Sequence, residues 1–506
     1  MELVGLIIGI IGIVLALIFG LRKPKAPPKL QKDIEKIKTQ LEQVAVYVDG
    51  LPEAKDKKKK ALFEKGMSLM AEYKYEQAIN SFRECLALET EGSEKAALFL
   101  LIGNSFYAWN KWDSALGSWK EALDAAEKAN DEQGQAAALG NLGLVYKDKG
   151  EWDKAIEFYN KSLKIKETIG DEHGMASIFN NLGVVYERKG EWDEAIEFYN
   201  KTLQIDKKIG DERGMAGTFN NLGLGYKAKG EWDKAIGFYN KSIEIYQKIG
   251  DERGMPYTFN SLGLLYQDKG EWDKATEFYN KSIEIYQKIG DEHGMAQTFN
   301  NLAGVYYLKG EWNEAEEFYE NSLRILERIG DEYGMSQNLT GLGLVYKAKG
   351  EWDKAIDFYN KSLKIKEKIG DEHGIAQTFN NLGLVYKAKG EWDKVIEFYN
   401  KALKGLEKIG DEHGMAQTFN NLGLVYKDKG EWDKAIEFYN KSSKIKEKIG
   451  DERGMAMTKA NIGILYKEQG KKEEARKLLE ESLRTFEKIG DRPNAEIVRE
   501  HLSAIG

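Results

Sequence analysis

The chain has 506 residues, too many for one hydrophobic core, and 31% of them are charged. Its net charge of −8 at pH 7 argues against nucleic acid as the main partner. The single cysteine, Cys85, excludes an internal disulfide framework, and we interpret it as a packing residue in a reducing compartment.

The N-terminal segment is strongly apolar. Residues 3–21 carry no charge and are long enough to cross a bilayer as a helix. Basic residues follow this run rather than precede it, beginning with Arg22 and Lys23. A cleaved secretory signal would need a basic start, so we favour an uncleaved anchor. Residues 1–22 are thus predicted to be a single-pass membrane anchor, with the rest of the chain in the cytoplasm.

Residues 23–60 contain two kinds of sequence. A proline- and lysine-rich stretch predicts an extended spacer directly after the anchor. Between residues 30 and 48, apolar residues recur at the spacing of a heptad seam over fewer than three heptads. This amphipathic helix could form a homodimer or fold back onto the neighbouring domain, and the sequence leaves both alternatives open.

A forty-residue period governs the remaining chain. From Asp131 to Gly490 the pattern recurs nine times without insertion or deletion. A fixed period of this length is typical of stacked supersecondary units. Proline is almost absent between residues 61 and 490, which favours continuous helices. The fold class predicted from these observations is all-α.

Each forty-residue unit contains two helical patterns. In the first, Phe179, Leu182, Gly183 and Tyr186 recur at helical spacing. We call this first helix of each unit helix A. Small residues such as Gly183 are expected where two helix backbones approach closely.

The second helix of each unit, helix B, follows a glycine. Gly190 is expected to end helix A in the left-handed conformation, and Ala195 and Tyr199 lie on one face of helix B. Gly210 is expected to end helix B, and Asp211 is a suitable N-cap for the next helix A. No unit can bury its apolar stripe alone, so neighbouring units must stack.

These residues resemble the tetratricopeptide repeat (TPR), a helix–turn–helix unit. The shared pattern is Leu182, Gly183 and Tyr186, followed by Ala195 and an aromatic residue at Tyr199. The unit length is similar to the longer repeats of kinesin light chain and the Pins/LGN scaffolds. The resemblance implies a right-handed α-solenoid superhelix in which helices A line a concave groove.

The resemblance covers residues 61–490 and implies about eleven repeats. Residues 61–130 hold two degenerate units, and residues 131–490 hold nine regular ones. Residues 491–506 are expected to form a capping helix that Pro493 opens, with Ile497, Val498, Leu502 and Ile505 facing inward.

Pairs of asparagines stand in the middle of the helix A pattern. One set immediately precedes the Leu-Gly pair or its equivalent: Asn141, Asn181, Asn221, Asn301, Asn381, Asn421 and Asn461. Ser261 and Gly341 interrupt this row. The other set stands one residue earlier: Asn180, Asn220, Asn260, Asn300, Asn380 and Asn420. All of these positions are candidates for the peptide-binding groove.

An uncharged amide can pair with the backbone of any extended segment, because it offers two donors and an acceptor. The resemblance implies this use for the set that precedes Leu-Gly. The alternative is a buried amide that bonds to the adjacent helix and fixes the register of the repeats. For the earlier set, the sequence does not favour either interpretation.

A mostly basic row occupies the position after the recurring tyrosine of helix A: Lys147, Lys227, Lys347, Lys387 and Lys427. In a groove, this row would suit acidic or C-terminal carboxylate peptides. The alternative is ordinary solvated helix charge. The tryptophans that open each helix B, such as Trp352, are interpreted as inter-helix packing residues.

No catalytic motif is recognisable in the sequence, and no cofactor or metal is expected. Four of the five histidines occupy the same position in separate repeats, so they cannot gather around one metal. We therefore expect a non-enzymatic, membrane-anchored scaffold that binds peptide segments of partner proteins. A peptide-responsive regulatory sensor and a structural spacer without a groove ligand are the alternatives.

Overall fold

The computed structural model describes residues 57–88 and 92–505. These residues contain 23 α-helices, α3 to α25, and no strand. They form two compact units, and the boundary between them follows Val305, within α15. The predicted anchor at residues 3–21 and the predicted heptad segment at residues 30–48 lie outside the described residues. None of the described helices is both long and apolar enough to span a bilayer.

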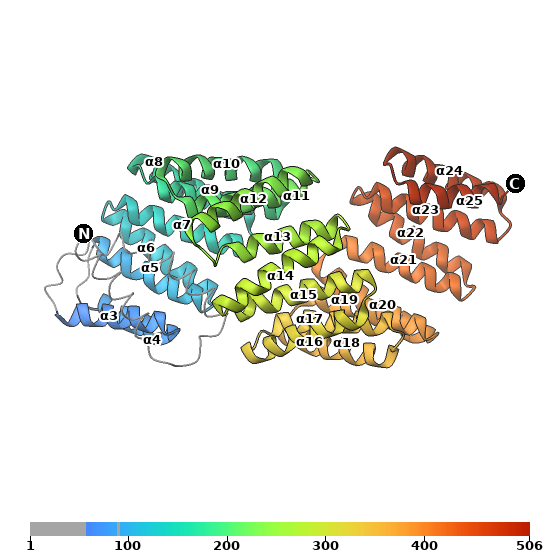
Figure 1. The fold of residues 1–506 in the computed structure, drawn as a ribbon, viewed down its shortest axis with the longest axis horizontal. Coiled ribbons are helices and arrows are strands. Elements are labelled where there is room, and N and C mark those ends of the chain that lie inside the picture. The colour runs from blue at the N-terminus through green and yellow to red at the C-terminus, as the bar shows by residue number, and fades with distance from the viewer. Residues whose placement is uncertain (1–56, 89–91, 506) are drawn as a thin grey trace. The chain divides into compact units, whose positions relative to one another are not determined.

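Helices A and B alternate along each unit, so that odd-numbered helices are helices A and even-numbered ones are helices B (Figure 1). Unit 1 contains α3 (Lys57–Ala71), α4 (Tyr75–Leu86), α5 (Gly92–Ala108), α6 (Trp112–Lys128), α7 (Glu132–Asp148), α8 (Trp152–Ile169), α9 (Glu172–Lys189), α10 (Trp192–Ile209), α11 (Glu212–Ala228), α12 (Trp232–Ile249), α13 (Met255–Asp268), α14 (Trp272–Ile289) and most of α15 (Glu292–Lys309).

Unit 2 continues the same alternation and ends with one additional helix, α25. It contains α16 (Trp312–Ile329), α17 (Glu332–Ala348), α18 (Trp352–Ile369), α19 (Glu372–Ala388), α20 (Trp392–Ile409), α21 (Glu412–Asp428), α22 (Trp432–Lys448), α23 (Glu452–Glu468), α24 (Lys472–Lys488) and α25 (Arg492–Ser503). Within each unit, an all-α solenoid of helical pairs is therefore confirmed.

The helix ends follow the sequence signals. Asp171 caps α9, because its Oδ1 accepts a hydrogen bond from the Gly174 amide at 2.8 Å. Gly190 ends α9 with φ of 78°, and Gly210 ends α10 with φ of 74°. Only glycine adopts this left-handed conformation without steric cost. The predicted boundaries between helices A and B are confirmed in this repeat.

Proline shortens one helix A. Pro256 lies in the first turn of α13, which begins at Met255, whereas α11 begins at Glu212. The Asp251 carboxylate accepts from the Arg253 amide at 3.0 Å instead of capping a helix. Proline is tolerated at this position and costs roughly one turn of helix.

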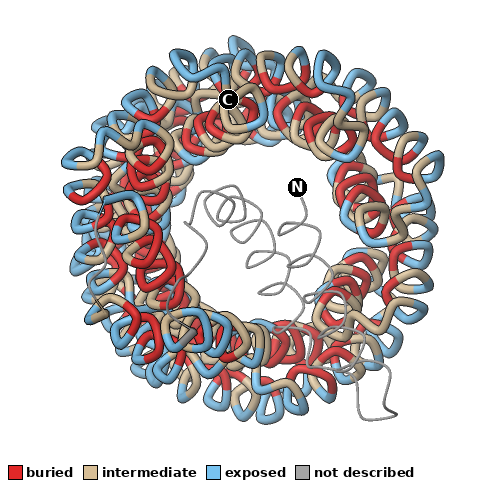
Figure 2. Tube along the Cα trace, turned by 90° about the vertical axis from the view of Figure 1, so that its left-hand side faces the viewer, coloured by how far each residue is buried: buried red, intermediate tan, exposed pale blue. Residues whose placement is uncertain are grey.

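The core of each repeat lies between its helices A and B. Leu182, Ala195 and Tyr199 have no exposed surface. A Cβ atom added at Gly183 would lie 2.5 Å from the Tyr199 ring, so the glycine is small to admit a tyrosine ring. The small residue predicted at Gly183 is thus explained by close packing against a side chain of helix B. Figure 2 shows buried residues where neighbouring helices pack and exposed residues on the sides turned away.

The last helix covers the end of unit 2. Asp491 caps α25, and its Oδ1 accepts from the Asn494 amide at 3.4 Å. Val498 and Ile505 are each 2% exposed, which confirms their predicted inward orientation. Ile497 was expected to face inward as well, but it is 50% exposed. Adjacent residues on a helix point about 100° apart, so Ile497 and Val498 cannot both face the same neighbour.

A candidate peptide-binding face

Helices A carry a partly exposed side, which α19 illustrates. Measured around the helix axis, Gln377, Asn381, Leu384 and Ala388 fall within about 60° of each other. Gln377, Leu384 and Ala388 are exposed and Asn381 is half-buried. We call this side of the helices A in each unit the A face. Asn380 lies about 100° away from Asn381.

The earlier asparagine set points toward neighbouring repeats. The Asn380 Nδ2 donates to Thr418 Oγ1 at 3.1 Å, and the Asn260 Nδ2 donates to Thr298 Oγ1 at 2.9 Å. Both threonines belong to the next helix A along the chain. These bonds match the alternative interpretation, in which the amide fixes the register of the repeats. Asn180, Asn220, Asn300 and Asn420 occupy the same helical position and are half-buried.

Three members of the later set also bond across repeats. The Nδ2 atoms of Asn221, Asn461 and Asn141 donate to the side-chain oxygens of other asparagines. Their acceptors are Asn180 at 2.9 Å, Asn420 at 3.2 Å and Asn104 at 3.3 Å, respectively. In these pairs, both asparagines hold adjacent helices A together.

The other four members of this set are Asn181, Asn301, Asn381 and Asn421. All four are half-buried on the A face, and no hydrogen bond within the described chain engages their amides. A half-buried amide without a partner retains its donors and its acceptor for a ligand or for solvent. These four amides are the part of the predicted row that the fold leaves unused.

The row is interrupted at Gly341 for a steric reason. A Cβ atom there would lie 2.5 Å from the ring of Tyr319, a residue of α16. Tyr319 is 8% exposed, so its ring fills the place of the missing side chain. Burial and the nearby Tyr307 hydroxyl raise the pKa of Tyr319 to about 12. The A face is therefore not uniform along unit 2.

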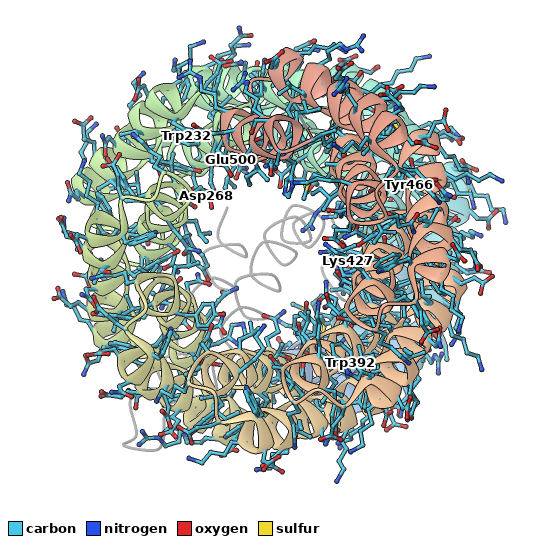
Figure 3. All side chains as sticks on the ribbon, turned by 90° about the vertical axis from the view of Figure 1, so that its right-hand side faces the viewer. Trp232, Asp268, Trp392, Lys427, Tyr466 and Glu500 are labelled. Carbon is cyan, nitrogen blue, oxygen red and sulfur yellow. The ribbon has the colours of Figure 1, made fainter. Side chains whose placement is uncertain are left out.

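The lysine row is largely neutralised by the next helix A. The Nζ atoms of Lys227, Lys387 and Lys427 lie near carboxylates that stand 41 residues later. The partners are Asp268 at 2.8 Å, Asp428 at 2.8 Å and Glu468 at 3.1 Å, respectively. Figure 3 labels Lys427 in unit 2 and Asp268 in unit 1, each projecting from its helix A.

The two remaining lysines of the row differ from these three. Lys147 lies 3.6 Å from the carboxylate of Asp148 on its own helix. Burial lowers the pKa of Lys147, which the Asp148 charge offsets only in part. Burial alone lowers the pKa of Lys347. Of the predicted basic row, Lys347 is thus the cation that no described acidic side chain pairs.

Sequence reasoning missed the residues beside the asparagines on the A face. In unit 2 they include the exposed Gln377 and Gln417, and the row Leu344, Leu384, Leu424 and Ile464. Leu384 is 37% exposed. The signal that could have found them was helical spacing, because these residues stand four before and three after the asparagine. An exposed apolar residue next to an amide supplies both apolar contact and hydrogen bonding.

Two other repeated positions are the tryptophan that opens helix B and the histidine in the first turn of helix A. Trp352 opens α18 and is 39% exposed, so its interpretation as a packing residue holds only in part. It lines a shallow cavity of about 230 Å³ together with Glu351 and Lys389. His373 lies 3.4 Å from Asp411, the N-cap of the next helix A. The described residues contain no cluster of His, Cys, Asp or Glu that could hold a metal ion.

Several solved structures are similar to the chain at low sequence identity. BtubC (BKLC) from P. vanneervenii is 24% identical, over 43% of this chain and 91% of that one, with a TM-score of 0.39. A Rap protein complexed with Competence and Sporulation Factor is 15% identical, over 78% and 98%, with a TM-score of 0.46. The apo quorum sensor NprR from B. thuringiensis is 17% identical, over 66% and 99%, with a TM-score of 0.46.

No curated protein matches the chain. The tetratricopeptide repeat family model matches it in eight segments, most of which overlap: residues 94–168, 134–208, 174–248, 214–288, 254–328, 294–368, 334–408 and 414–488. These segments cover most of units 1 and 2, and their helical pairs coincide with the repeats. The chain belongs to the tetratricopeptide repeat family.

Proposed function

We propose that this protein is a membrane-anchored scaffold whose A face binds peptide segments of partner proteins in the cytoplasm. The main support is the set of four unengaged amides at Asn181, Asn301, Asn381 and Asn421. Other asparagines of the same row join repeats through hydrogen bonds, whereas these four amides keep their donors and acceptor available for a ligand.

The chemistry of the A face suits a peptide backbone. An amide donates to a backbone carbonyl and accepts from a backbone N–H, whatever the partner's side chains are. In unit 2, Asn381 and Asn421 belong to helices A of successive repeats. Leu384 and Leu424 stand three residues after them and supply apolar contact. Each repeat would contribute a weak contact, and several together would reach an affinity on the order of micromolar.

A selection of random peptides displayed on phage would test this binding. The full chain would be purified in detergent, and the enriched peptides measured by fluorescence anisotropy. Changing both Asn381 and Asn421 to Ala should weaken their binding by about tenfold or more, because each lost bond to a buried polar group costs on the order of 1 kcal/mol.

Asn400 and Asn440 provide the matched control. They are exposed asparagines on helices B of the same unit. Their double substitution by Ala should leave affinity within about twofold of the wild type. Equal effects of the two double variants, or the absence of any enriched peptide, would favour a structural spacer. Compaction of the chain on peptide addition, measured by small-angle scattering, would favour a regulatory sensor.

Membrane anchoring is a separate part of the proposal and rests on the apolar residues 3–21. The full chain should remain with membranes after alkaline carbonate extraction. Replacing Ile11 and Leu15 with Lys should release it, because charge in the middle of a membrane span is costly. Protease accessibility of the repeats from the cytoplasmic side would test the orientation. Release of the wild-type chain by carbonate would overturn the anchor and leave the peptide-binding proposal standing.

A further inference from the structure

A ladder of lysine–carboxylate pairs joins successive helices A beside the A face. Lys387 on α19 pairs with Asp428 on α21 at 2.8 Å. Lys427 on α21 pairs with Glu468 on α23 at 3.1 Å. In each pair the lysine and the acid stand 41 residues apart, on successive helices A. The stack therefore supplies its own anion for each of these cations.

Lys347 on α17 breaks this ladder. The residue 41 positions later is Ala388, which is exposed on α19. Lys347 is half-buried and forms no ion pair with any described residue. Burial lowers the pKa of Lys347 without an opposing carboxylate. The cation has lost part of its hydration and has gained no anion in exchange, which is unfavourable unless a ligand supplies one.

A buried hydroxyl accompanies this lysine. Tyr199 donates to the Glu187 carboxylate at 2.8 Å, and Tyr279 donates to Gln267 at 3.2 Å. Both bonds join a helix B tyrosine to the residue 12 positions earlier on helix A. For Tyr359 that residue is Lys347, which cannot accept a hydrogen bond.

Tyr359 has no exposed surface, and its hydroxyl has no partner within the described residues. Burial raises the pKa of Tyr359, and the charge of the Tyr307 side chain adds to that effect. The hydroxyls of Tyr159, Tyr239 and Tyr439 are also without a partner among the described residues. The lysine 12 positions before each of these tyrosines, however, has a carboxylate partner. Only at Lys347 do the described cation and hydroxyl both lack an acceptor.

We propose that Lys347, with the Tyr359 hydroxyl beside it, forms a carboxylate-binding pocket between α17 and α19. The carboxylate belongs to a peptide segment of the partner and takes the place that Asp428 holds in the next repeat. The pocket rests on the proposed function, since it is a specificity site beside the A face. It fixes the register of the bound peptide, because neighbouring lysines are already neutralised.

The ligand class follows from the donors. An ammonium group and a hydroxyl offer hydrogen bonds to an anion and little to a cation. The residue next to Lys347 on α17 and the residue 41 positions after it on α19 are both small: Ala348 and Ala388. Both an acidic side chain and a C-terminal carboxylate have this chemistry, and modified peptides can distinguish the two.

The peptides enriched on the wild-type full chain would be synthesised in three versions. The first is unchanged, the second has Gln and Asn in place of Glu and Asp, and the third has an amidated C-terminus. Fluorescence anisotropy would then be measured with the wild type and with four variants: Lys347→Met, Ala388→Asp, Ala388→Ser and Lys427→Met.

On the wild type, removing the recognised carboxylate should weaken binding about tenfold, which is typical of losing one charge-assisted hydrogen bond. Weaker binding of the second version identifies a side-chain carboxylate, and weaker binding of the third version identifies the C-terminal carboxylate. Lys347→Met should weaken binding of the unchanged peptide by a similar factor. Ala388→Asp should do the same, because it supplies the carboxylate internally. Ala388→Ser and Lys427→Met should retain both affinity and carboxylate dependence.

Three results would overturn the pocket. Equal affinity of all three versions for the wild type would show that peptides bind without a carboxylate site, which leaves the proposed function intact. Full carboxylate dependence in both Lys347→Met and Ala388→Asp would place the site elsewhere. Failure to enrich any peptide would overturn the pocket and the proposed function together.

Discussion

Asn221 donates a hydrogen bond from its Nδ2 to the Oδ1 of Asn180, 2.9 Å away on the preceding helix A. The two residues belong to the two asparagine sets, one repeat apart. This pair explains why adjacent asparagines recur on helix A. One side chain points to the next repeat, and the other can reach back to the previous repeat or remain on the A face.

The bonded and unbonded asparagines should differ in their effect on stability. Asn221→Ala removes a donor and leaves the Asn180 oxygen without it, so we expect a loss of about 1–3 kcal/mol. Asn381→Ala should change stability by less than about 0.5 kcal/mol, since its amide has no partner within the described residues. Hydrogen exchange of α9, α11 and α19 would measure both. Similar protection losses in the two variants would contradict the distinction.

Glycine at the helix A position that faces a tyrosine should be essential. Gly183→Ala places a Cβ atom 2.5 Å from the Tyr199 ring. The ring is fully buried and cannot move aside, so we expect a cost of about 1–3 kcal/mol. The control is Gly237→Ala on α12, where no atom lies within 4 Å of the added Cβ. That change should stabilise α12 by about 0.5–1 kcal/mol. Thermal unfolding would show opposite shifts, and destabilisation by both variants would refute the steric explanation.

The buried Asp206 should make stability depend on pH. Burial raises its pKa to about 6, although Thr218 donates to its carboxylate at 3.1 Å. Its stabilising contribution is therefore fully present below its unfolded pKa of 3.8 and is lost as pH rises through about 6. Asp206→Asn should raise local stability at pH 7 by about 1–3 kcal/mol, from the shift of roughly two pKa units.

This advantage of Asp206→Asn should nearly vanish at pH 4. Hydrogen exchange of α10 and α11 at both pH values would measure it. The charges of Asp211 and His173 also shift the pKa of Asp206. Hydrogen exchange of Asp211→Asn at pH 4 and pH 7 would therefore serve as a control for the N-cap. An advantage that is equal at pH 4 and pH 7 would exclude titration of Asp206 as the cause.

A buried lysine in unit 2 should be replaceable by leucine. Lys366 is 4% exposed, and Leu326 and Leu406 occupy the same position in the adjacent repeats. Its Nζ bonds to Thr340 and Thr378, but burial still lowers the pKa of Lys366. Lys366→Leu should stabilise unit 2 by about 1–2 kcal/mol, because it removes a desolvated charge without a loss of packing.

Lys368→Leu is the matched control for that change. Lys368 is exposed and pairs with Glu332 at the surface. Its replacement should alter stability by less than about 1 kcal/mol. Urea unfolding of both variants would compare them. Destabilisation by Lys366→Leu would mean that the hydrogen bonds of the ammonium group outweigh its desolvation.

The repeat architecture was predictable because its signals are local. Asp171 caps a helix through an amide three residues away, and Gly190 ends the same helix through its own φ. The apolar stripe that includes Leu182 needs only helical spacing to be recognised. Ile497 was misplaced because two adjacent apolar residues near the end of the chain both fitted an inward-facing pattern.

The sequence by itself determined the helices, their period and the candidate asparagine row. Which asparagines remain available was decided only by the stacking of repeats, since Asn221 and Asn381 have the same local sequence position. The lack of an acidic partner for Lys347 likewise depends on a residue that is 41 positions away in the sequence but lies next to it in the stack. Contacts between repeats are set by how helices pack in three dimensions, and local pattern does not contain that information.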